Sequence, residues 1–73
     1  MREKGVGRNV EEIRVWMLRN HTRQTDIAER AQVSSALVNR TLKGKEDNMR
    51  VLHAMVSLGF PREILGIPDH RQS

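Results

Sequence analysis

Apolar residues along this chain recur at helical spacing, and no segment alternates with the period of two that a half-buried strand requires. The first stripe places four apolar side chains on one face of a helix: Val10, Ile13, Trp16 and Met17. Asn9 precedes the stripe as an N-cap residue, so a helix is predicted from about Val10 to Asn20. Val15 and Leu18 fall off the stripe and give this helix a second, smaller apolar edge.

A second helix is predicted to begin near Arg23 or Gln24 and to end before a tight turn at Gln32 and Val33. Its inward-facing positions are Ile27, Ala28 and Ala31. Ala28 is small at the point where this helix would come closest to the next one. A larger side chain there would push the two helices apart.

A third helix is predicted from Ser35 to about Lys43, with Ser34 as its N-cap and Gly44 as the residue that ends it. Its inward-facing positions are Val38, Thr41 and Leu42. The turn before it is too short for two antiparallel neighbours, so the second and third helices must cross steeply. The opposite face of the third helix is then presented to solvent.

The remaining apolar positions predict two further helices. A polar loop over residues 45–48 leads to a fourth helix, capped by Asp47 or Asn48, that ends at Gly59. A last short helix is predicted from Pro61 to Leu65, because proline fits the first turn of a helix. The fold class is therefore all-α, with five short helices.

A chain of 73 residues is enough for one compact domain. Residues 1–8 are predicted to be a flexible basic arm, residues 9–67 the folded domain and residues 68–73 a polar tail. The chain has no cysteine, and its three histidines, His21, His53 and His70, lack the spacing of metal ligands. We therefore expect no metal and no cofactor.

The charge balance favours a polyanionic partner. The chain carries 13 Lys and Arg against 9 Asp and Glu, a formal net charge of +4, and its isoelectric point is about 10.7. Most of the cations are arginine, the side chain best suited to phosphate and to guanine edges. Trp16 and Phe60 are the sole aromatic residues, too few for a platform that stacks single-stranded bases. Duplex DNA is the polyanion that fits best.

Other classes of protein are disfavoured by what the sequence lacks. The N-terminus has no apolar core of a secretory signal, and no stretch approaches the length of a membrane span. We therefore expect a soluble, cytoplasmic protein. The chain also lacks a nucleophile elbow, a phosphate loop and a paired catalytic acid and base, so an enzyme is not expected.

The segment from Gln24 to Gly44, QTDIAERAQVSSALVNRTLKG, resembles the helix-turn-helix of the λ-repressor/Cro-like (XRE-type) family. That pattern is Gln, Ala four residues on, a turn, Ser or Thr, and then Val or Ile. The part VSSALVNRTLKG also resembles the recognition helix of the LacI family. The Cro-like resemblance continues through the fourth helix and LGFPREILGIP, so it covers about residues 9–67. One departure is Gln32, where the family usually has glycine at positive φ.

The resemblance implies a λ-repressor-like domain that binds double-stranded DNA sequence-specifically and regulates transcription, as phage and mobile-element repressors do. It implies that the third helix reads bases in the major groove through Ser35, Ala36, Asn39 and Arg40. It also implies that a second set contacts phosphates: Arg23, Gln24, Ser34, Lys43 and Lys45. Other surface arginines, Arg14, Arg19 and Arg50, are interpreted as ordinary surface charges.

A homodimer on a palindromic operator is also expected, since one recognition helix alone reads a short, weak site. Helices 1 to 4 are expected to close a core by themselves. Four apolar residues near the C-terminus would then be left for a two-fold contact: Phe60, Ile64, Leu65 and Ile67. The alternative is that this region covers the core of its own monomer.

Two other functions remain open at this point. The chain could be the antitoxin of a toxin–antitoxin pair, which would bind a protein as well as DNA. It could also be a protein-interaction or inhibitor module that uses the same fold without DNA. Salt-dependent binding to duplex DNA would separate the transcriptional regulator and the antitoxin from the module that does not bind DNA.

Overall fold

The computed structural model describes residues 7–67, and the regular secondary structure of this part of the chain is helical, without a strand. Its elements are α1 (Val10–Arg19), α2 (Gln24–Ala31), α3 (Ser35–Leu42), α4 (Met49–Leu58) and one turn of 3-10 helix, η1 (Arg62–Ile64). The all-α prediction is confirmed, whereas the expected fifth helix is this single 3-10 turn. Most of the predicted arm (residues 1–6) and the predicted tail (residues 68–73) lie outside the described residues.

Side-chain caps set the beginnings of three helices, as the sequence predicts. The Asn9 side chain accepts a hydrogen bond from the Glu12 amide at 3.0 Å and so begins α1. The Ser34 hydroxyl accepts from the Leu37 amide at 3.3 Å and begins α3. Of the two candidates for α4, Asn48 is the cap, since its side chain accepts from the amide at position 51 at 3.1 Å.

The turn between α2 and α3 depends on a residue in the left-handed region. Gln32 has φ 59° and ψ 48°. Glycine is the residue expected in this conformation, and the sequence has glutamine there instead. The Gln32 amide donates to the Glu29 carbonyl at 3.3 Å, and the next amide, that of Val33, donates to the Ala28 carbonyl at 3.1 Å. These bonds close α2 and turn the chain toward α3 within a few residues.

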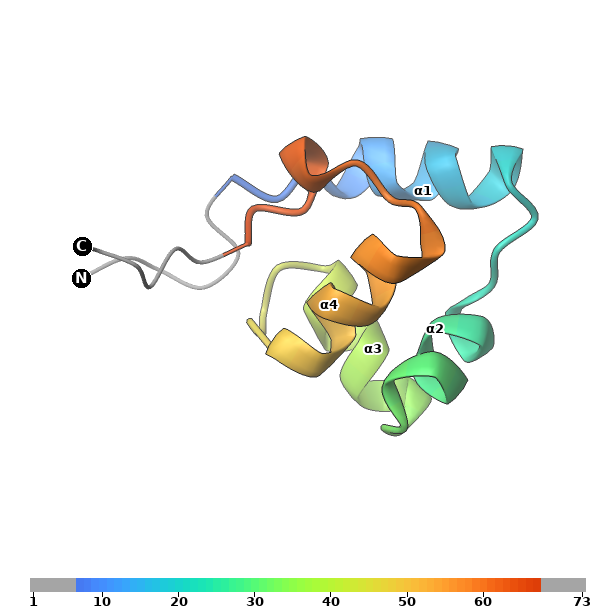
Figure 1. Ribbon diagram of the computed structural model, residues 1–73. Coiled ribbons are helices and arrows are strands. Elements are labelled where there is room, and N and C mark those ends of the chain that lie inside the picture. Colours follow the sequence, from blue (N-terminus) through green and yellow to red (C-terminus); the bar gives the residue numbers. More distant parts are fainter. Residues whose placement is uncertain (1–6, 68–73) are drawn as a thin grey trace.

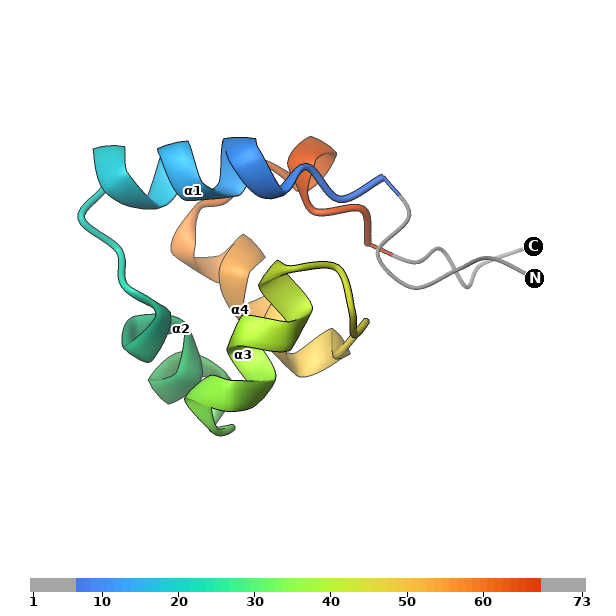
Figure 2. The ribbon, with the colours of Figure 1, turned by 180° about the vertical axis from the view of Figure 1, so that it is seen from behind.

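Helices α2, α3 and α4 form one group, and α1 crosses above it with η1 alongside (Figures 1 and 2). The predicted inward faces of α2 and α3 are all buried. The largest fully buried side chains are Ile13, Ile27, Leu52, Met55, Leu65, Val38, Val51 and Thr41. No helix among the described residues is long and apolar enough to cross a membrane.

The segment after α4 belongs to the core of the monomer. Phe60 is 3% exposed and stacks on Trp16 of α1, with ring centroids 3.9 Å apart, and Leu65 is fully buried. The expectation that helices 1 to 4 close the core alone is therefore wrong, and Phe60 and Leu65 are not available for a dimer contact. Ile64 and Ile67 are half-buried and pack against the same core.

The segment forms a 3-10 turn, in which the Ile64 amide donates to the Pro61 carbonyl at 3.3 Å and the Leu65 amide donates to the Arg62 carbonyl at 3.1 Å. The Ile64 carbonyl accepts from the Asn9 amide at 2.8 Å. The Leu65 carbonyl accepts from Nε of Arg8 at 2.6 Å. These bonds fix a single 3-10 turn beside the beginning of α1.

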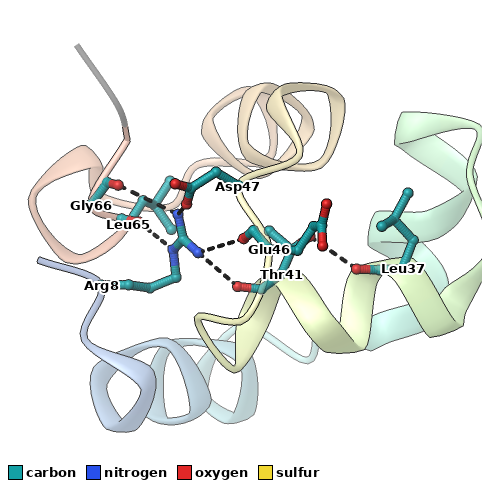
Figure 3. Close-up of polar contacts among 7 residues, drawn as sticks. All are labelled: Arg8, Leu37, Thr41, Glu46, Asp47, Leu65 and Gly66. Atoms are coloured by element: carbon teal, nitrogen blue, oxygen red, sulfur yellow. Dashed lines mark hydrogen bonds and ion pairs between the residues drawn. The ribbon is translucent and has the colours of Figure 1, made fainter. Parts of the chain in front are cut away.

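Arg8, assigned by the sequence to a flexible arm, is instead a buried part of the fold (Figure 3). Its side chain is 1% exposed and forms an ion pair with Asp47 at 2.7 Å. Its guanidinium also donates to four carbonyls, those of Thr41 at 3.0 Å, Glu46 at 2.9 Å, Leu65 at 2.6 Å and Gly66 at 3.4 Å. The five N–H groups of the guanidinium thus find acceptors on three separate segments of the chain. The prediction of a flexible arm is wrong at this residue.

We expect Arg8→Met to destabilise the fold by about 3–5 kcal/mol, because it keeps the aliphatic stem but removes the buried ion pair with Asp47 and the hydrogen bonds that the guanidinium donates to carbonyls. Thermal or urea unfolding measures the change. Arg14→Met is the matched control, since the Arg14 side chain is 73% exposed and the change should be small. Equal stability of Arg8→Met and the wild type would contradict a structural role for Arg8.

We expect Gln32→Gly to raise the free energy of unfolding by about 0.5–1 kcal/mol, because glycine adopts positive φ without a Cβ clash. Gln32 is exposed and no side-chain contact is lost. Gln32→Ala keeps the Cβ and should not stabilise. Urea unfolding of the three proteins tests this, and a gain with alanine equal to that with glycine would refute it.

Candidate nucleic-acid interface

One face of α3 is open to solvent along its length. The predicted base-reading residues Ser35, Ala36 and Arg40 are all exposed on it. The opposite face carries Val38 and Thr41, both fully buried. Because 35, 36 and 40 are one residue or one turn apart, their side chains lie together on the same side of the helix.

The buried face holds α3 in a fixed orientation. The Thr41 hydroxyl donates to the Leu37 carbonyl at 2.9 Å, so this buried polar group is satisfied within the helix. The Thr41 carbonyl accepts from Nη1 of Arg8 at 3.0 Å, which ties the end of α3 to the N-terminal segment (Figure 3). The exposed face is therefore presented by a helix that is anchored at its core side and at its C-terminus.

Gln24 links the beginning of α2 to α3. Its Nε2 donates to the Ser35 carbonyl at 3.1 Å, and its Oε1 accepts from Nδ2 of Asn39 at 3.3 Å. Gln24 and Asn39 are both half-buried as a result. The Asn39 amide keeps its second N–H and its carbonyl oxygen for another partner. Sequence reasoning gave these two residues separate roles, and the structure joins them as a clamp between the helices.

The predicted phosphate-contacting residues differ in their surroundings. Lys43 and Lys45 are exposed at the end of α3, and Ser34 is exposed at its beginning. Arg23 is exposed before α2, where its Nε lies 3.8 Å from Asp26. The Arg23 side chain of this pair is exposed to solvent, so its guanidinium remains accessible.

A groove brings three of the predicted residues together with an arginine of α1. It has a volume of about 400 Å³ and is lined by Val10, Arg14, Met17, Gln24, Asn39, Leu42 and Lys43. Val10, Met17 and Leu42 supply apolar lining, while Arg14 and Lys43 contribute positive charges from α1 and from the end of α3. An anionic group with an apolar body, such as a sugar–phosphate, matches this lining.

The charged side chains of residues 34–45, which span α3 and its two ends, are of one sign. Residues 34–45 contain no Asp or Glu. They contain Arg40, Lys43 and Lys45, and all three side chains are exposed. A second hollow, of about 440 Å³, contains Asp26 and Glu29 together with Arg30, so its charges are mixed. The surface around α3 is thus the better match for a polyanion.

Arg14 is the residue that sequence reasoning missed. From the sequence it is interpreted as an ordinary surface charge. The spacing along the helix could have indicated its place. Arg14 is four residues after Val10 and three before Met17, so it lies on the flank of the apolar stripe that turns toward α3. Arg14 forms an ion pair with Glu11 at 3.9 Å. Both side chains are exposed, so the guanidinium of Arg14 remains accessible to another partner.

Comparisons of the chain with protein-family models, curated proteins and solved structures find no match. The described residues also contain no group of three or more His, Cys, Asp or Glu side chains that could hold a metal ion. The nature of this surface is therefore argued from its own geometry and charge.

If the surface binds duplex DNA, Arg14→Gln should weaken binding and lower the slope of log K against log salt by about 0.9, the effect of one lost phosphate contact. Titrations at several salt concentrations measure both quantities. Arg62→Gln is the matched control, because Arg62 is exposed on η1 and does not line the groove. Identical slopes for the two variants would exclude Arg14 from the interface.

Proposed function

We propose that this protein is a sequence-specific double-stranded DNA-binding regulator of transcription, in which α2 and α3 form a helix-turn-helix and α3 reads the major groove. The single observation that carries the proposal is the exposed face of α3, on which Ser35, Ala36 and Arg40 are open to solvent and flanked by cations. A helix of this diameter fits the major groove of B-form DNA.

The contacts around α3 support direct readout. Arg40 can donate two hydrogen bonds to the O6 and N7 of a guanine, and Ala36 can contact a thymine methyl group. Asn39 reaches bases with the amide groups that Gln24 leaves unused. Because Gln24 and the core fix α3, the helix itself does not have to be ordered on binding.

The cations around α3 support affinity without sequence preference. Arg23, Lys43 and Lys45 are exposed at the ends of α2 and α3, and Arg14 stands across the groove. Phosphate contacts of this kind position a protein on the duplex, whereas base contacts specify the site. The resemblance of residues 24–44 to the λ-repressor/Cro-like pattern supports the same arrangement. A repressor of the phage type, acting as a homodimer on a palindromic operator, is the form of regulator we propose.

The test begins with selection of bound duplexes from a random library, which returns the site and its symmetry. Binding of the selected site and of random DNA is then measured for the wild type, Arg40→Ala and Lys45→Ala. We expect Arg40→Ala to lose about 1–3 kcal/mol on the selected site and to relax the preference at one base pair. We expect Lys45→Ala to weaken specific and random DNA alike.

Two results would overturn the proposal. A wild-type protein that shows no salt-dependent duplex binding would exclude DNA as the ligand and favour a protein-interaction module. An unchanged base preference in Arg40→Ala would exclude α3 as the reading helix. Co-purification of a small protein with the wild type would identify the antitoxin form of this function.

A further inference from the structure

The groove between α1 and α3 has apolar lining that contact with phosphates does not require. Phosphates are bound by cations and polar groups, and Arg14 and Lys43 are the cations that line this groove. Three apolar side chains line it as well, Val10 and Met17 of α1 and Leu42 of α3. Phosphate contacts by themselves therefore leave the apolar part of the lining without a function.

The size and depth of the groove suit a small molecule with a charged end and an apolar end. Its volume of about 400 Å³ falls within the range of about 300–1,000 Å³ found for small-molecule sites. The apolar lining lies deeper than the cations, since Leu42 is 9% exposed whereas the Arg14 side chain is 73% exposed. A ligand of this kind would place its hydrocarbon body inward and its charged group at the rim.

The polar groups of the groove suit a carboxylate. The guanidinium of Arg14 can donate two parallel hydrogen bonds to a carboxylate, because its exposed ion pair with Glu11 leaves it accessible. Lys43 adds a second positive charge, and Asn39 keeps an N–H that can donate. Among the described residues, no Asp or Glu lines this groove, so none of its lining side chains repels an anion.

We infer that this groove binds a small carboxylate with a hydrocarbon body, and that this ligand and duplex DNA exclude each other. Gln24, Asn39 and Lys43 all line the groove and also belong to the proposed DNA surface. A bound carboxylate occupies polar groups that would otherwise meet DNA, and DNA lowers the affinity for the carboxylate by the same factor. The exclusion rests on the proposed function, whereas binding of the ligand to the free protein does not.

Octanoate is the probe, because it joins a carboxylate to an unbranched hydrocarbon chain. An NMR titration of the free protein follows the amide signals of the residues that line the groove. We expect these signals to shift saturably, with a dissociation constant of about 1 mM. Acetate has the charged end alone and octan-1-ol has the hydrocarbon body alone, so each should bind about tenfold more weakly or less.

Two pairs of variants of α1 separate the charged contact from the apolar one. Arg14→Gln should weaken octanoate binding about threefold or more, whereas Arg19→Gln, at an exposed position outside the groove, should not. Val10→Thr keeps the shape of the side chain but makes it polar, and it should also weaken binding about threefold or more. Val15→Thr is its matched control outside the groove. Thermal melting checks that all four variants fold.

Exclusion is measured as the affinity for duplex DNA at increasing octanoate and constant sodium concentration. Octanoate at ten times its dissociation constant should raise the apparent dissociation constant for DNA about elevenfold. An unchanged affinity for DNA overturns the exclusion. The absence of saturable shifts up to about 10 mM octanoate overturns the ligand site, as does an equal loss in both members of a variant pair. If the protein binds DNA without binding octanoate, the inference falls and the proposed function stands. If it binds octanoate without binding DNA, the ligand site stands, and the proposed function falls together with the exclusion.

Discussion

The buried guanidinium of Arg8 connects parts of the chain that are far apart in sequence. Its acceptors lie at the end of α3, in the loop before α4 and after η1, while Arg8 itself directly precedes the cap of α1. A planar group with five donors suits this junction, because each converging segment contributes a carbonyl or carboxylate that accepts from it. This one side chain links the beginning of α1 to the end of α3 and to the segment after η1.

The proposed reading surface follows from that anchoring. Arg8 holds the C-terminal end of α3 through the Thr41 carbonyl, and Gln24 holds its N-terminal half through Ser35 and Asn39. Between these two points Val38 is fixed in the core. The helix is consequently held in place while the side chains of Ser35, Ala36 and Arg40 stay exposed, which suits the reading of an external ligand by direct hydrogen bonds.

Helix α1 has three faces with different surroundings. Ile13 lies in the core, Arg14 lines the groove next to α3, and Leu18 points away from both. In a domain this small, a single helix contributes both to stability and to the proposed DNA contact. The exposure of Leu18 costs little, because isolated surface leucines are common.

The sequence by itself determined the local structure. Periodicity located four helices to within one or two residues, and Asn9, Ser34 and Asn48 act as caps because a short polar side chain satisfies the same free amides in any context. The exposed face of α3 was also predictable, since its apolar positions repeat at helical spacing. Gln32 was correctly singled out as the left-handed residue of the turn.

Tertiary structure alone decided the contacts between distant segments. Arg8 looked like part of a charged arm because nothing near it in sequence reveals the carbonyls that surround it in the fold. Phe60 and Leu65 looked surplus because their partners, such as Trp16, lie tens of residues earlier in the chain. Arg14 lines the groove because α1 crosses beside α3. Caps and periodicity act within a few residues, whereas burial, ion pairs and grooves depend on how whole helices are placed, and this placement is fixed by packing rather than by local pattern.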